Sequence, residues 1–78
     1  MKKIEIYSTP TCHFCHLAKD YFNANKIEYT DYNVATDIEK RKEMLNKSGQ
    51  MGVPVIVIDD KDIVIGFDQS RLKSLLGI

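Results

Sequence analysis

The hydrophobic pattern changes its period twice within the first 34 residues, and this change constrains the fold more than any other feature. Residues 3–8 alternate between polar and apolar side chains, which predicts a strand. From Thr11, the expected N-cap, apolar residues recur every three or four positions, which predicts a helix to about Asn25. Residues 27–34 alternate again. Two strands joined through a helix pair in parallel with a right-handed crossover, so the chain is predicted to begin with a βαβ unit.

The next three elements are also indicated by their patterns. The sequence TDIE at residues 36–39 matches a capping box and Gly49 is a typical stop, which together predict a helix over residues 37–48. Residues 54–58 form the most apolar run and lack alternation, as expected of a central strand covered on both faces. Residues 63–65 follow after a short turn, so this strand must pair antiparallel with the one before it.

A final helix completes the predicted fold. Asp68 is its expected N-cap, and three leucines follow at helical spacing: Leu72, Leu75 and Leu76. The predicted element order is therefore βαβαββα, which is an α/β fold. A chain of 78 residues suits one small domain over residues 1–78, because two hydrophobic cores need more chain.

Composition excludes several classes of function. Eleven Lys and Arg residues balance eleven Asp and Glu residues, so the broad attraction for phosphate backbones that marks many nucleic-acid binders is missing. Glu5 and Ser8 interrupt the apolar residues after the basic start, and no apolar run approaches the length of a membrane span. We expect a cytoplasmic protein that acts as a monomer, without nucleic-acid or membrane partners.

Two cysteines three positions apart are the first candidates for chemistry. The motif CHFC at residues 12–15 falls where the first strand leads into the first helix, the context in which such a pair indicates redox activity. Cys12 would face unpaired N–H groups and the positive end of the helix dipole, which favour the reactive thiolate. Cys15, one turn further in, is expected to be buried and to attack the mixed disulfide that Cys12 forms first. His16 and Lys19 each follow a cysteine by one helical turn and can add positive potential.

Other interpretations of this stretch remain open. Residues 12–16 also spell C-x-x-C-H, the attachment signature for c-type haem, but that chemistry ordinarily needs export and a helical surround. The two cysteines, with His13 and His16, are of zinc-ligand types, yet structural zinc sites draw a second pair from elsewhere and the chain has no other Cys or His. The cysteines can also be buried without function, and both histidines can be simple exposed helix residues.

Two further segments are candidates for the site. Gly52-Val53-Pro54 leads into the central strand, where a proline is tolerated only if its missing N–H is not required, so Val53–Pro54 is a candidate cis peptide. Gly66-Phe67-Asp68 ends the last strand. The simplest interpretation of that segment, a strand end followed by a helix cap, leaves Phe14 and Phe67 as exposed aromatic residues without an explanation.

Together these residues resemble a glutaredoxin, the smallest branch of the thioredoxin fold. The resemblance is carried, in chain order, by Ile6-Tyr7-Ser8, by the C-x-x-C-x-x-A-K pattern from Cys12 to Lys19, by Gly52-Val53-Pro54 and by Gly66-Phe67-Asp68. It covers nearly the whole chain and implies a four-stranded mixed sheet flanked by three helices. It also implies that a cis-Pro54 loop packs beside Cys12. The substrate-binding or glutathione-binding residues that it implies are Thr11, His13, Phe14, Gly52, Val53, Pro54, Gly66, Phe67 and Asp68.

The resemblance implies a thiol-disulfide oxidoreductase that takes part in electron transport and in cell redox homeostasis. Cys12 would attack a protein disulfide or a glutathione mixed disulfide, and Cys15 would resolve the product. No bound cofactor or metal is expected, and glutathione is the expected reductant and co-substrate. The backbone of Val53 would pair with the thiol substrate, and the segment from Gly66 to Asp68 would meet the γ-glutamyl end of glutathione.

Departures from the family pattern affect the substrate more than the chemistry. Thr9 and Gln50 stand where family members that use glutathione commonly carry a Lys or Arg, and Ile65 and Gln69 replace a second glycine and a second aspartate. One alternative is therefore a redoxin that donates electrons to an enzyme such as ribonucleotide reductase and is recharged by a flavoprotein thioredoxin reductase. Another is a non-catalytic module whose cysteines hold zinc or an iron-sulfur cluster.

Overall fold

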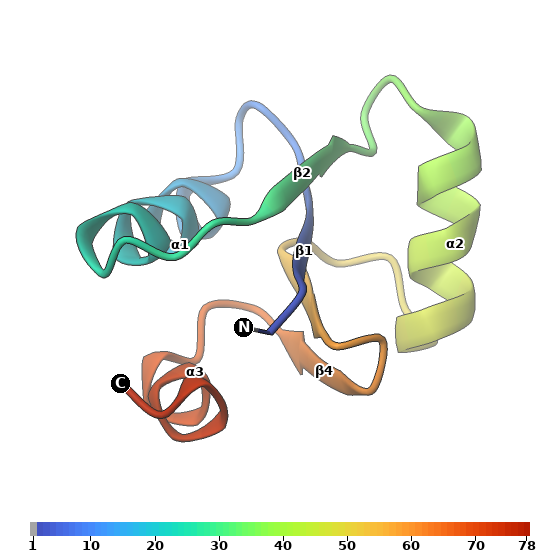
Figure 1. Ribbon diagram of the computed structural model, residues 1–78. Coiled ribbons are helices and arrows are strands. Elements are labelled where there is room, and N and C mark those ends of the chain that lie inside the picture. The colour runs from blue at the N-terminus through green and yellow to red at the C-terminus, as the bar shows by residue number, and fades with distance from the viewer. Residues whose placement is uncertain (1) are drawn as a thin grey trace.

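The computed structural model describes residues 2–78, and its elements follow the predicted order βαβαββα (Figure 1). The elements are β1 (Ile4–Ser8), α1 (His13–Ala24), β2 (Thr30–Asn33), α2 (Ile38–Ser48), β3 (Val55–Ile58), β4 (Asp62–Ile65) and α3 (Gln69–Leu76). None of the helices within residues 2–78 is both long and apolar enough to span a membrane.

The strands form one mixed sheet in the order β2-β1-β3-β4. β1 and β2 are parallel, as the predicted βαβ unit requires, whereas β3 is antiparallel to both β1 and β4. All four residues of β3 are buried, which confirms the prediction of a central strand covered on both faces. β2 is shorter than the predicted strand over residues 27–34, because only Thr30–Asn33 lie opposite β1. Ile27 and Tyr29 instead pack against the core from the connecting segment.

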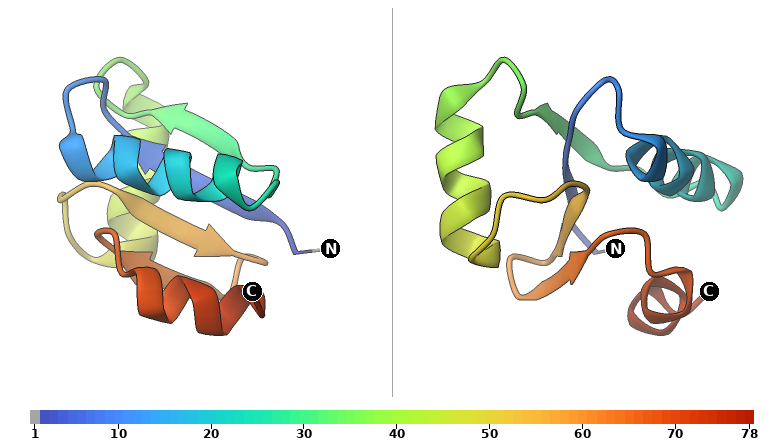
Figure 2. Two further views of the ribbon diagram at one scale, coloured as in Figure 1. Left: turned by 90° about the vertical axis from the view of Figure 1, so that its left-hand side faces the viewer. Right: turned by 180° about the vertical axis from the view of Figure 1, so that it is seen from behind.

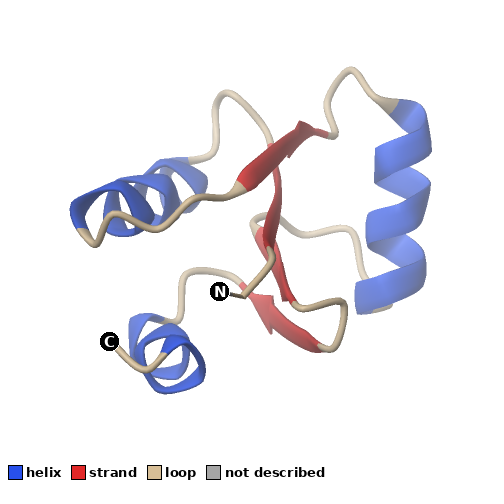
Figure 3. Ribbon diagram, in the orientation of Figure 1, coloured by secondary structure: helices blue, strands red, loops and turns tan. Residues whose placement is uncertain are grey.

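Helices cover both faces of the sheet. α1 and α3 lie on one face and α2 lies on the other (Figures 2 and 3). Alternate strand residues point to opposite faces, so the sheet contributes to two separate cores. The core beneath α1 and α3 contains Ile4, Ile6, Ala18, Phe22, Ile56, Ile58, Val64 and Leu72. The core beneath α2 contains Tyr7, Val34, Met44, Val55 and Val57.

Two of the predicted helix starts are wrong by one residue. Cys12, not Thr11, is the N-cap of α1, because the Cys12 sulfur rather than the Thr11 hydroxyl accepts an N–H of the first turn. Asp37, not Thr36, caps α2, because its side chain accepts from the backbone N–H of Lys40 at 3.1 Å. The prediction that Asp68 caps the last helix is confirmed.

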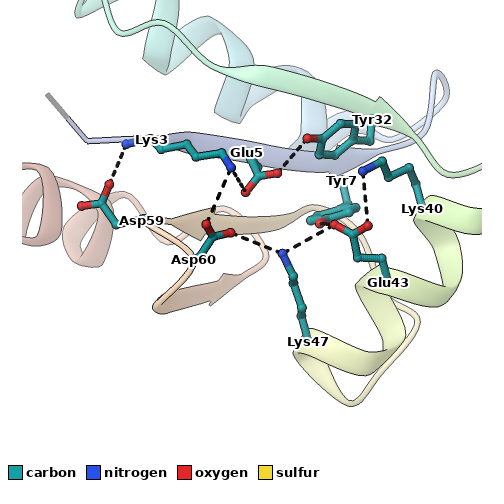
Figure 4. Close-up of polar contacts among 9 residues, drawn as sticks. All are labelled: Lys3, Glu5, Tyr7, Tyr32, Lys40, Glu43, Lys47, Asp59 and Asp60. Carbon is teal, nitrogen blue, oxygen red and sulfur yellow. Dashed lines mark hydrogen bonds and ion pairs between the residues drawn. The ribbon is translucent and has the colours of Figure 1, made fainter.

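A polar network spans the sheet face that α2 covers (Figure 4). Glu5 is 4% exposed, and the Tyr32 hydroxyl donates to its Oε2 at 2.7 Å. The hydrogen bond to Glu5, aided by burial, raises the pKa of Tyr32 to about 12, so this phenol is a donor at neutral pH. Within residues 2–78 Glu5 Oε1 has no hydrogen-bond partner, and Lys3 Nζ lies 3.9 Å from it. The Tyr32 hydroxyl is therefore the main compensation for a buried carboxylate.

Tyr32→Phe is expected to destabilise the protein by about 1–3 kcal/mol, because it leaves both oxygens of a buried carboxylate without a hydrogen bond. Tyr29→Phe is the matched control, since its packing contact is made by the ring, 5.4 Å from Phe22. Urea unfolding of both variants measures the difference. Equal unfolding free energies for the two variants would contradict this account of Glu5.

A second hydrogen bond in the network makes the folding stability of the protein depend on pH. The Tyr7 hydroxyl donates to Glu43 Oε1 at 2.5 Å and is the largest cause holding the pKa of Glu43 below its ordinary 4.5, with Lys40 and Lys47 adding to it. A carboxyl group whose pKa is lower in the folded state than in the unfolded state stabilises the protein at pH values above its unfolded-state pKa. This contribution is lost as the pH falls through the folded-state pKa.

Tyr7→Phe is therefore expected to cost about 1 kcal/mol at neutral pH, a modest amount because Glu43 is partly exposed to solvent. The difference in unfolding free energy between the wild type and Tyr7→Phe should narrow as the pH falls below 4.5, because Glu43 then becomes protonated in both proteins. Unfolding free energies measured between pH 7 and pH 3 test the prediction. A gap that stays constant over this range would show that Glu43 ionisation is not involved.

Candidate functional site

Cys12 occupies the start of α1 and is itself part of the helix cap. Its backbone N–H donates to the Thr9 carbonyl at 3.3 Å, which closes a turn directly before the helix. Its sulfur accepts the backbone N–H of Cys15 at 3.2 Å. The side chain is partly exposed. A helix N–H aimed at the sulfur, together with the positive end of the helix dipole, suits a negative charge at this position.

Cys15 has the opposite environment one turn further along α1. It is 0% exposed and, like Cys12, is a free thiol. Burial, followed by its hydrogen bond with Cys12, raises the pKa of Cys15 to about 12. The predicted difference in depth between the two cysteines is therefore present in the structure. One sulfur is accessible to a substrate, and the other is protonated and enclosed.

The loop before β3 lies against the Cys12 sulfur. Cys12 Sγ is 3.8 Å from the carbonyl oxygen of Val53, and the Val53–Pro54 peptide is cis. The carbonyl of Pro54 in turn accepts the backbone N–H of Gly66 at 2.8 Å. Gly66 has a φ of 78°, a conformation that glycine adopts without steric cost. The three motifs selected from the sequence therefore meet at one end of the sheet.

The aromatic residues of these motifs differ in their surroundings. Phe14 is 57% exposed, and its ring lies edge-on to His13 with the centroids 5.5 Å apart. Phe67 is partly buried and packs edge-on against Tyr21 at 5.7 Å. The simplest interpretation of this segment, which would leave Phe67 as an exposed aromatic residue, is thus wrong, because its ring packs against the core beneath α1 and α3.

The remaining predicted site residues lie around this junction. Thr11 and Gly52 are exposed. Asp68 accepts from the backbone N–H of Arg71 at 3.1 Å, so part of its hydrogen-bonding capacity serves the cap of α3. The His16 ring nitrogen Nε2 is 2.8 Å from the carbonyl oxygen of Pro10 and stabilises the loop that leads to Cys12. No group of three or more metal-ligating side chains converges among residues 2–78.

Gln50 has a structural task that sequence reasoning missed. Its side-chain oxygen accepts the Gly52 N–H at 2.6 Å, and its amide nitrogen donates to the Gly52 carbonyl at 3.0 Å. One side chain therefore satisfies both backbone groups of a glycine directly before Val53. From the sequence alone, Gln50 stands out only as a position without a positive charge.

Sequence reasoning also missed a polar cluster beside α1. Lys19 Nζ forms an ion pair with Asp31 Oδ2 at 2.7 Å, and the Ser8 hydroxyl donates to Asp31 Oδ1 at 2.6 Å. Lys19 was selected for its spacing from Cys15, but neither Ser8 nor Asp31 was connected with it. The contact depends on the register of β1 against β2, which places Asp31 opposite Ile6.

Comparisons with known proteins confirm the resemblance. The family model described as Glutaredoxin matches residues 4–63. A protein of Clostridium pasteurianum, named an uncharacterized glutaredoxin-like 8.6 kDa protein in rubredoxin operon, is 45% identical over 73 residues, which cover 94% of this chain and 96% of that one. Glutaredoxin 3 of Escherichia coli is 35% identical over 63 residues, which cover 81% of this chain and 76% of its own.

Solved structures confirm the thioredoxin fold. A mutant of the thioredoxin-like protein BC3987 superposes with a TM-score of 0.90 at 35% identity, covering 100% of this chain and 99% of the other. NrdH-redoxin from Escherichia coli superposes with a TM-score of 0.80 at 25% identity, covering 94% of this chain and 93% of the other. It is described as a glutaredoxin-like protein with a thioredoxin-like activity profile.

The contrast between the two cysteines predicts selective alkylation. At pH 8 a thiol whose pKa is about 12 is ionised in about one molecule in ten thousand, and the Cys15 sulfur is also shielded by burial. Iodoacetamide under native conditions should therefore modify Cys12 at least about 100-fold faster than Cys15. Mass spectrometry of Cys12→Ser and Cys15→Ser measures the two rates separately. Comparable rates in the folded variants would show that Cys15 is accessible.

Proposed function

The chain belongs to the glutaredoxin family, and we propose that it is a thiol-disulfide oxidoreductase in which Cys12 attacks and Cys15 resolves. The observation that carries the proposal is the contrast within one helical turn between a partly exposed Cys12 sulfur at the helix start and a fully buried Cys15. A nucleophile must reach its substrate, whereas a resolving thiol has only to reach the neighbouring sulfur.

The proposed reaction consists of two exchanges. The Cys12 thiolate attacks one sulfur of the substrate disulfide, forming a mixed disulfide and releasing the other sulfur as a thiolate that takes up a proton. Cys15 then loses its proton and attacks the Cys12 sulfur, which releases the second substrate thiol and leaves a Cys12–Cys15 disulfide. The substrate gains two electrons and the protein loses two, so two thiols of an external reductant must restore the pair.

We propose that an extended thiol substrate lies along the loop before β3. The Val53 carbonyl, 3.8 Å from the Cys12 sulfur, would be its backbone partner. Gly66, held to Pro54 by a backbone hydrogen bond, would present the segment through Asp68 to the γ-glutamyl end of glutathione. Phe14 and the exposed residues Thr11 and His13 would complete the rim of this site.

Glutathione is the proposed reductant and co-substrate, and one observation favours a second candidate. Thr9 and Gln50 carry no charge, and the side chain of Gln50 is engaged with the backbone of Gly52. Each charge-assisted hydrogen bond to a carboxylate is worth about 1.5–3 kcal/mol, so a site without these charges holds glutathione less tightly. The second candidate is a redoxin with the same dithiol chemistry that is recharged by a flavoprotein reductase, and the similarity to NrdH-redoxin agrees with it.

Reduction of a glutathionylated peptide, coupled to glutathione, glutathione reductase and NADPH, tests the proposal. Cys12→Ser should abolish turnover, because it removes the attacking sulfur. Cys15→Ser should keep turnover on this substrate, since glutathione itself can release the mixed disulfide at Cys12, but it should lose activity on protein disulfides.

The same assay on the wild-type protein distinguishes between the two candidate reductants. Turnover with glutathione supports the first candidate. No turnover, in a protein whose dithiol still oxidises and reduces, supports recharging by a flavoprotein reductase. Full activity of Cys12→Ser on every disulfide substrate would overturn the proposed chemistry as a whole.

A further inference from the structure

We propose that Lys19, held in place by Asp31, is a positioning residue that stabilises the Cys15 thiolate during the resolving step. The inference rests on the proposed function, because it concerns the second of the two exchanges. It assigns a role to a polar cluster that the first exchange does not use. The cluster consists of Lys19 on α1, Asp31 on β2 and Ser8 at the end of β1.

The resolving step needs such a group because Cys15 is costly to ionise where it lies. The thiol is fully buried, and burial is the largest cause that raises its pKa to about 12. The thiolate must nevertheless form before Cys15 can attack the mixed disulfide. The positive charge of Lys19, together with a backbone hydrogen bond from Thr9, acts against the effect of burial at this thiol.

Helix geometry places Lys19 on the same face of α1 as Cys15. Lys19 follows Cys15 by four residues on α1, and residues at this spacing lie on the same helix face with their Cβ atoms about 5–6 Å apart. That face is turned inward, since Cys15 and Ala18 are 0% exposed and the Lys19 side chain is 19% exposed. Partial removal from solvent strengthens the field of the ammonium at the sulfur.

Asp31 and Ser8 hold the ammonium at this position. The ion pair between Lys19 Nζ and Asp31 Oδ2 is 2.7 Å long, and Asp31 Oδ1 accepts the Ser8 hydroxyl at 2.6 Å. Ser8 is 2% exposed, so the carboxylate is tied to a rigid part of the sheet. Asp31 therefore has two opposing effects: it fixes Lys19 in place, and its negative charge offsets part of the positive field.

Other groups also act on the Cys15 thiol. Cys12 hydrogen-bonds to Cys15 and raises its pKa, and a backbone hydrogen bond from Thr9 lowers it. On β1, Glu5 and Tyr7 belong to the network beneath α2, on the opposite face of the sheet. β3 is entirely aliphatic. Lys19 does not take the proton of Cys15, which passes to solvent; it stabilises the charge that remains on the sulfur.

Reaction with the chromogenic disulfide 5,5′-dithiobis(2-nitrobenzoic acid) separates the two exchanges. Attack by Cys12 releases one thionitrobenzoate, and attack by Cys15 on the resulting mixed disulfide releases the second. The rate of the second release, followed by stopped flow between pH 5 and pH 10, reports on the resolving step alone. Because the pKa of Cys15, about 12, lies above this range, a change in that pKa appears as a change of rate at each pH. Cys15→Ser identifies the second release, because that variant should lack this phase.

Two substitutions break the same ion pair with opposite expected effects. Lys19→Met removes the cation and leaves the Asp31 charge, so the second release should be about 3- to 10-fold slower across this pH range. Asp31→Asn keeps the cation and removes its counter-charge, so the second release should be faster. Lys19→Arg should stay near the wild type. Asp20→Asn and Lys42→Met, at exposed positions, are matched controls for net charge.

A slower second release in Lys19→Met together with a faster one in Asp31→Asn supports the inference. A purely structural ion pair would slow the second release in both variants, and this result, or no change in either, would overturn it. If Lys19→Met does not fold, Lys19→Gln replaces it: a slower second release supports the inference, and an unchanged rate overturns it. Loss of the first release in the wild-type protein would instead contradict the proposed function, so the two failures are distinguishable.

Discussion

The position at which α1 begins is the constraint on which the rest of the structure depends. The N–H of Cys15 donates to the sulfur of Cys12, so the first turn of the helix and the pair of thiols are one unit. The inward face of α1, formed by Cys15, Ala18 and Phe22, is fully buried. A rotation or shift of the helix would disturb this face and the thiol pair together. The chemistry at the helix start is therefore held in place by apolar packing along the whole helix.

The sequence predicted those elements best whose burial is reflected directly in periodicity. β3 is buried on both faces and has an unbroken apolar run, and α1 has a regular inward stripe. β2 was predicted too long because Ile27 and Tyr29 contribute to the core without pairing in the sheet, which imitates a strand pattern. The start of α1 was misplaced because a hydroxyl is the usual cap, whereas here a sulfur accepts the hydrogen bond.

The parts of the candidate site that are short continuous motifs could be predicted from the sequence. The parts that depend on the register between strands could not. The three loop motifs stand out by their residue types, and the structure brings them together through Val53, Pro54 and Gly66. The cluster of Ser8, Lys19 and Asp31 shows no local pattern, because its members come from three elements whose alignment is set by the sheet. The task of Gln50 was hidden for a similar reason, since a side chain that binds nearby backbone looks in the sequence like an ordinary polar residue.

The two hydrogen bonds between the Gln50 side chain and Gly52 have a consequence for how the specificity of this chain can evolve. A cation introduced at residue 50 to attract a more acidic ligand would also remove the acceptor that now binds the Gly52 N–H, since neither Lys nor Arg has an acceptor atom. A substitution at residue 50 that raises the affinity for an acidic ligand therefore also reduces the order of the loop beside Cys12. Selection for charge recognition is easier at Thr9, three residues before Cys12, where the backbone carbonyl rather than the side chain closes the turn.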